Sequence, residues 1–115
     1  MTIEQLINLI KTNPESIEFQ QVMETIEQNY DYTPTRFTNS EAVNESGTNE
    51  GSCKIFAFGQ LNQLDEHETL ACFGTYYRDD VLQNPKGTDH ANIRSFMVHG
   101  WESINFDTPA LVVKS

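Results

Sequence analysis

The densest group of chemically capable side chains lies in two short runs, residues 76–80 and residues 89–94. Together they hold two arginines, three aspartates, one histidine and two tyrosines. Between the runs stands the sequence Asn-Pro-Lys-Gly, which is typical of a turn. If the flanking segments are helices packed as an antiparallel hairpin, the side chains near this turn meet in space and form a cleft.

Two interpretations of this cleft compete. In the first, Arg78 and Arg94 bind an anion through paired hydrogen bonds, and His90 beside Asp80 or Asp89 is an oriented general base. In the second, Asp89 caps a helix and the arginines form ion pairs with neighbouring carboxylates. We favour the second, because polar groups near helix ends usually serve capping and ion pairing. No catalytic residue is assigned, and the candidate ligand-binding residues are Tyr76, Arg78, Asp80, Asp89, His90 and Arg94.

The sequence gives little support for a metal centre. Its three histidines are never spaced as H-x-x-x-H, and no C-x-x-C pair is present. The oxygen-rich alternative around His90 consists of Asp79, Asp80 and Asp89, which are not part of a defined ligand loop. We therefore expect no metal and no cofactor.

The two cysteines, Cys53 and Cys72, are too few for a disulfide framework, and no disulfide is expected. Cys53 follows a glycine-containing loop at an expected helix start, where a thiol pKa falls and reactivity rises. Both cysteines stand among apolar residues, so small buried hydrophobes are the favoured interpretation. The loop itself, residues 47–52, leads into a helix but lacks the Gly-Lys-Ser/Thr ending of a phosphate-binding loop.

Short helices are the elements that must position these groups. Residues 2–12 have apolar side chains at helical spacing behind a capping box, and a second helix ends near Asp31. The apolar residues 53–61 predict a buried helix, although their composition also suits a strand. A further capping box opens a helix over 65–80, and another helix runs from Thr88 or Asp89 to Gly100.

The rest of the chain is expected to be extended or irregular. Residues 32–40 alternate threonines in an extended pattern, and residues 41–45 suit a short helical turn. Residues 103–106 have the composition to pair as a strand with residues 35–38. The last residues, 107–115, are expected to form a loose tail.

Length and composition agree with one domain. Of the 115 residues about a quarter are Leu, Ile, Val or Phe, which exceeds the roughly 20% below which a charged chain stays disordered. The sequence therefore predicts a mainly α fold, a compact single domain of about four to six short helices with one short two-stranded pairing.

Charge excludes two classes of partner. The net charge is −10, from 17 acidic and 7 basic residues, so a nucleic-acid backbone or an anionic membrane would repel the protein. The first fifty residues hold nine acids and two bases, and the remainder hold eight acids and five bases. An anion-binding surface is therefore expected in the second half. The start of the chain lacks a secretory signal pattern, which favours the bacterial cytoplasm.

Several long strings follow one another in a distinctive order: PESIEF at 14–19, YDYTPT at 30–35, GSCKIFAF at 51–58, LACFGTYYR at 70–78, VLQNP at 81–85 and GTDHANIRSFM at 87–97. Through these strings the chain resembles the HopJ type III effector family over nearly its whole length. The resemblance implies one HopJ-like domain, which we place at residues 1–106. It also implies delivery into a host cell by a type III secretion system, with a host protein as partner, but no established reaction.

Two functional hypotheses follow. The leading one is a small acidic soluble binding or interaction protein that resembles HopJ effectors. The alternative is a housekeeping bacterial metabolite- or metal-binding protein, or an enzyme, that uses the cleft around residues 76–94. Whether any reaction is catalysed stays open, and a small acidic secretion chaperone is a third class that fits less well.

Overall fold

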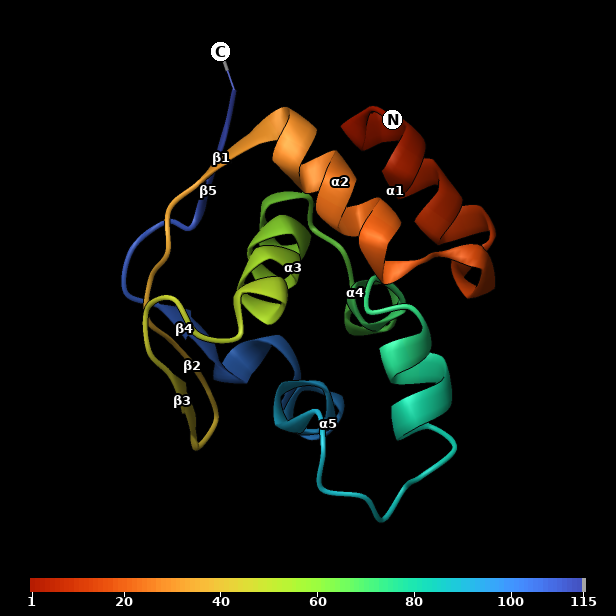
Figure 1. Cartoon of the computed structure of the whole chain (residues 1–115), viewed down its shortest axis with the longest axis vertical. Coiled ribbons are helices and arrows are strands. Elements are labelled where there is room, and N and C mark those ends of the chain that lie inside the picture. Colours follow the sequence, from red (N-terminus) through yellow and green to blue (C-terminus); the bar gives the residue numbers. More distant parts are fainter. Residues whose placement is uncertain (115) are drawn as a thin grey trace.

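Five α-helices form the body of the fold in the computed structural model, which describes residues 1–114 (Figure 1). They are α1 (Ile3–Thr12), α2 (Phe19–Asn29), α3 (Glu50–Leu61), α4 (Glu66–Ala71) and α5 (Ala91–His99). Shorter helical segments are η1 (Pro14–Ser16), η2 (Tyr76–Val81) and η3 (Gly100–Ser103). The prediction of a mainly α fold is confirmed. Within residues 1–114, no helix is long and apolar enough to cross a membrane.

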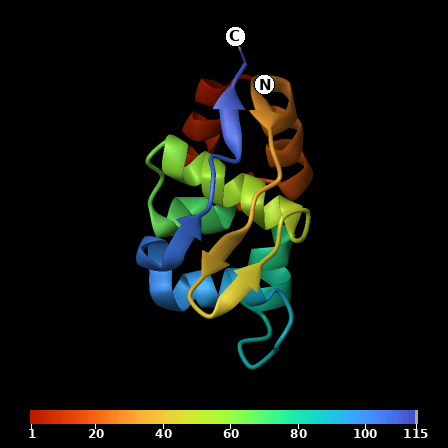
Figure 2. The same cartoon turned by 90° about the vertical axis from the view of Figure 1, so that its left-hand side faces the viewer.

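Five strands of three residues each lie together on one side of the helices (Figure 2). They are β1 (Tyr30–Tyr32), β2 (Phe37–Asn39), β3 (Ala42–Asn44), β4 (Ile104–Phe106) and β5 (Leu111–Val113). They form two antiparallel sheets, one in the order β3-β2-β4 and one that joins β1 to β5. The predicted pairing is present as β2 with β4, where Phe37 lies opposite Phe106. The other pairings were missed, because three-residue strands are too short to show alternation.

Two expectations about extended chain are wrong. Residues 41–45 contain strand β3 rather than a helical turn, since Ser40 takes a left-handed φ of 56° and lets the chain fold back on β2. The predicted loose tail at 107–115 is in fact part of the fold over residues 107–114. There Leu111 is buried and β5 pairs with β1, because both bring apolar side chains to the same surface. Ser115 lies outside the described residues.

Helix α3 is the centre of the hydrophobic core, and the predicted helix at 53–61 is confirmed. It is apolar around most of its circumference because other elements cover it on several sides. The ring of Phe56 is 0% exposed, and its centroid lies 4.9–6.4 Å from those of four other rings. These rings belong to Phe37, Phe73, Phe96 and Trp101. Burial of this aromatic cluster ties α3 to α5 and β2.

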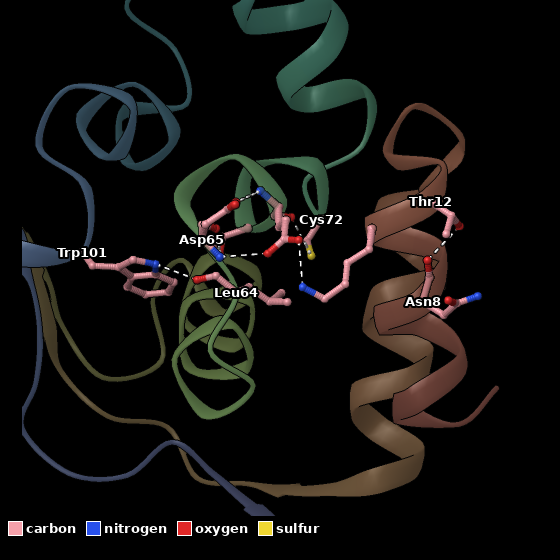
Figure 3. Close-up of polar contacts among 9 residues, drawn as sticks. Asn8, Thr12, Leu64, Asp65, Cys72 and Trp101 are labelled. Carbon is pink, nitrogen blue, oxygen red and sulfur yellow. Dashed lines mark hydrogen bonds and ion pairs between the residues drawn. The ribbon is translucent and has the colours of Figure 1, made fainter.

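A predicted capping box begins α4. The backbone N–H of Glu68 donates to the Asp65 carboxylate at 2.7 Å, and the Asp65 N–H donates back to Glu68 at 3.0 Å. Beside it, the indole N–H of Trp101 donates to the Leu64 carbonyl oxygen at 2.9 Å (Figure 3). This bond fastens the segment after α5 to the connection between α3 and α4.

The helix expected over 65–80 ends early, at Ala71. Gly74 has a φ of +61°, a conformation that favours glycine. A Cβ atom at this position would lie 2.7 Å from the backbone nitrogen of Phe19, so the start of α2 packs directly against the glycine. The break turns the chain into η2, which carries the first of the two chemically capable runs.

The α4 cap predicts how stability depends on pH. The hydrogen bond from the Asp65 backbone and the Lys11 ammonium, 3.0 Å away, hold the pKa of the Glu68 carboxyl below its ordinary value. A depressed folded-state pKa stabilises the protein above the unfolded pKa of about 4.3, and this contribution disappears as pH falls through the folded value. We expect Glu68→Gln to flatten the loss of unfolding free energy below about pH 5, measured by urea denaturation. Glu66→Gln, at an exposed position on the same turn, is the control. If the unfolding free energy of Glu68→Gln fell with decreasing pH as steeply as that of the wild type, the role given to Glu68 would be contradicted.

Candidate functional site

The side chains of the first predicted run, residues 76–80, lie on the π-helix η2 and point in two directions. Its wide turn is shown by the Leu82 N–H, which donates to the carbonyl oxygen of Tyr77 at 3.0 Å, five residues earlier. Single π-turns recur at functional sites. Tyr76 and Asp80 both contact His90, whereas the guanidinium of Arg78 donates to the Ile17 carbonyl oxygen at 2.8 Å. Arg78 therefore holds the segment before α2.

His90 occupies the N-cap position of α5 with a left-handed φ of 50°. Its Nε2 lies 3.0 Å from Asp80 Oδ2 and 3.8 Å from Asp89 Oδ2. Its ring centroid lies 5.2 Å from that of Tyr76. A carboxylate only accepts hydrogen bonds, so in the neutral imidazole Nε2 donates to Asp80 and Nδ1 carries the lone pair. The structure thus brings four of the six predicted residues together, with Tyr76, Asp80 and Asp89 around His90.

Arg94 stabilises the loop before α5. Its guanidinium donates to the carboxylate and the carbonyl oxygen of Asp89, at 2.6 and 2.7 Å, and to the carbonyl oxygen of Asn84 at 2.9 Å. The bond from Arg94 holds the pKa of the Asp89 carboxyl below its ordinary value. Since Arg78 and Arg94 bind carbonyl oxygens of different elements, the predicted two-arginine clamp is absent from the described residues.

Cys53 is buried, with 1% of its surface exposed, and Cys72 is buried as well; both thiols are free. Burial raises the pKa of the Cys53 thiol, which opposes the lowering expected at a helix start. Burial also raises the pKa of Cys72 to about 12. The interpretation as small buried hydrophobes is therefore the one that the geometry supports. Within residues 1–114, His, Cys, Asp and Glu side chains form no group of three or more placed to hold a metal ion.

Tyr76 and His90 border a pocket of about 490 Å³. It lies between β3, the start of α2 and the starts of α3 and α5, and both of the latter helices begin on the same side of the molecule (Figure 2). The main side chains around it are Phe19, Val43, Asn44, Asn49, Ser52, Phe73, Tyr76, His90, Asn92 and Ile93. Its size falls within the roughly 300–1,000 Å³ typical of small-ligand sites.

Asparagines that sequence analysis missed connect the walls of this pocket. Asn44 and Asn92 are buried and exchange amide hydrogen bonds of 3.1 and 2.9 Å. Asn49 donates to Asn44 Oδ1 at 2.7 Å, and buried Asn39 donates to the Asn92 carbonyl oxygen at 2.8 Å. These bonds link β2, β3 and the starts of α3 and α5. Nothing local in the sequence marks them, because the partners in the reciprocal pair are 48 positions apart.

Both helices that begin at the pocket lack a side-chain cap, whereas α1 and α4 each have a capping box. Their N-caps, Asn49 and His90, are left-handed. Among residues 1–114, the backbone N–H groups of Gly51, Ser52 and Ala91 have no hydrogen-bond acceptor. Such groups carry partial positive charge and remain able to donate.

The fold and the site define a class of protein: a single mainly α domain with a pocket at the starts of two helices. Residues 3–111 match the family described as HopJ type III effector protein, and the chain belongs to this family. The solved crystal structure of the unknown-function protein VPA0580 is 54% identical, with a TM-score of 0.97. The similarity covers 99% of this chain and 95% of that chain. The comparison with curated proteins gave no match.

Proposed function

We propose that this HopJ-family protein is a binding domain whose ligand or partner side chain occupies the pocket beside Tyr76 and His90. The observation that carries the proposal is that η2, β3, α3 and α5 all meet around a single concave space of about 490 Å³. The space combines apolar walls with a few polar groups that converge on it, which is the usual character of a ligand site.

The polar groups around the pocket are held in place before anything binds. Asp80 orients the imidazole of His90 at 3.0 Å, and the reciprocal bonds between Asn44 and Asn92 fix both amides. A site with fixed groups loses less conformational entropy on binding. This arrangement supports binding as the activity, and the proposal includes no catalytic step.

Occupancy of the pocket is tested by thermal unfolding in the presence of a metabolite library. A compound that binds only the folded protein raises stability by about 2.7 kcal/mol at 100 times its dissociation constant. We expect His90→Gln to weaken such a compound about tenfold, since a charged or polar hydrogen bond is worth that much. His99→Gln, at the far end of α5, is the matched control. Compounds that bind wild type and His90→Gln equally would place the site elsewhere.

We further propose, from family membership, that the protein is delivered into a host cell and binds a host protein there. The alternative is a metabolite-binding protein that acts in the bacterial cytoplasm. The full chain fused to a reporter enzyme that is active only inside host cells distinguishes them, in a secretion-competent strain and its secretion-null twin. We expect a secretion-dependent signal. Good bacterial expression without that signal would contradict delivery and favour the alternative.

A further inference from the structure

Three aromatic rings form a row along one side of the pocket. The ring centroids of Phe19 and Tyr76 lie 5.0 Å apart, and those of Tyr76 and His90 lie 5.2 Å apart. Tyr76 is 41% exposed, so much of its ring is free of protein contacts. Consecutive rings with an accessible face favour a planar group, because aromatic rings pack well in stacked or edge-to-face arrangements.

The two buried amide oxygens at the pocket, those of Asn44 and Asn92, are already occupied. Asn44 Oδ1 accepts hydrogen bonds from Asn49 and Asn92, at 2.7 and 2.9 Å. Asn92 Oδ1 accepts from Asn39 and Asn44, at 3.3 and 3.1 Å. A carbonyl oxygen has two lone pairs, so neither amide oxygen retains capacity. Asp80, the nearest carboxylate to His90, already accepts a hydrogen bond from the imidazole.

Donors around the pocket remain unused. Asn92 is only 6% exposed, yet one of its two amide hydrogens has an acceptor among residues 1–114 and the other has none. The Asn49 amide also has one hydrogen without an acceptor, because Asn44 Oδ1 is its single acceptor among residues 1–114. The hydroxyl of Ser52 and the N–H groups of Gly51 and Ala91 add further donors. A ligand with acceptor oxygens would satisfy these donors.

The charge around the pocket also favours a ligand that carries acceptor oxygens. The protein has 17 acidic residues, but none of the described residues that line the pocket is an aspartate or a glutamate. An anionic group placed there would therefore lie against hydrogen-bond donors and not against a lining carboxylate.

We infer that the pocket binds a small molecule in which a planar ring carries an oxyanion, either a carboxylate or a phosphate. This inference rests on the proposed function and specifies the ligand class for the same site. The ring lies against Tyr76, and the oxyanion accepts hydrogen bonds from Asn92 and the start of α5. The volume of about 490 Å³ accommodates both parts.

Amide NMR titrations with matched probes test the inference. Benzoate and phenyl phosphate carry ring and oxyanion, benzyl alcohol and benzylamine carry the ring alone, and acetate and inorganic phosphate carry the oxyanion alone. We expect benzoate or phenyl phosphate to shift the amides of Gly51, Ala91 and Asn92 and to bind about tenfold more tightly than the other four probes. Comparison of these two arms separates carboxylate from phosphate. Tighter binding of benzyl alcohol or benzylamine, or no shift with any probe, would overturn the inference.

Two variants locate the interaction. Tyr76→Leu at its exposed position is expected to remove most of the advantage of benzoate over acetate, and the amide spectrum itself shows that the variant is folded. Ser52→Ala is expected to weaken the binding of both benzoate and acetate. Leu82→Ala, at an exposed position outside the pocket, is the control. Equal binding of all ring probes at the pocket overturns the ligand class but leaves the binding proposal standing. The metabolite screen decides that proposal separately.

Discussion

Replacement of Phe56 by alanine is expected to lower the free energy of unfolding by about 3–5 kcal/mol. The side chain is 0% exposed, and its ring packs against four others from β2, α5 and the segments that follow α4 and α5. Alanine would leave a cavity at the point where these elements meet, so both transfer energy and packing energy would be lost.

Urea denaturation followed by circular dichroism measures this change. A domain of this size is stable by about 5–15 kcal/mol, so we expect the variant to fold at low temperature. Its urea midpoint falls in proportion to the lost free energy, and its thermal unfolding midpoint falls by tens of degrees. Tyr76→Ala, which removes an exposed ring, is the control and should cost less than about 1 kcal/mol. A loss below about 1.5 kcal/mol for Phe56→Ala would show that the surrounding rings are not the centre of the core.

Replacement of Asn92 by leucine is expected to lower the free energy of unfolding by about 2–3 kcal/mol. The two side chains have similar size, so the cost comes from polarity. The change removes both partners of the Asn44 amide in the reciprocal pair, and Asn44 is only 3% exposed. The Asn44 amide keeps the bond from Asn49 and long bonds to the carbonyl oxygens of Phe37 and Ala42, but at a buried position it cannot replace the two lost bonds with water.

The double variant distinguishes this cause from a packing defect. Asn44→Leu with Asn92→Leu is expected to cost less than the sum of the single changes, because two apolar side chains then face each other and the reciprocal bonds are absent from both. Asn105→Leu, at an exposed position on β4, is the control. Strict additivity of the two changes would show that the amides do not stabilise one another.

Local chemistry was sufficient for several elements. Thr2 with Gln5 and Asp65 with Glu68 form the predicted capping boxes, because a cap and its partner are three residues apart and need no other segment. The helix at 53–61 followed from a long apolar run between polar segments. Gly100 ends α5 as expected, with a φ of +65° that suits glycine.

The strands and the directions of side chains were harder to predict from the sequence. The β5 residues gave no signal of their own, since a three-residue strand is defined by the partner it meets, here β1. Arg78 was placed in the cleft on the basis of its neighbours in sequence. The glycine break at 74 and the π-turn directed it to the Ile17 carbonyl oxygen instead.

The sequence by itself determined the helical class, the acidic charge and the family, because composition, apolar spacing and long strings of residues are properties of the chain alone. Only the tertiary structure decided the candidate site. The Asn44–Asn92 pair joins segments that local spacing does not relate, whereas the contact of Asp80 with His90 was expected from the turn between the two runs. Formation of the asparagine pair depends on how α3, α5 and the β-hairpin pack, and that packing follows from burial of the aromatic core rather than from any local motif.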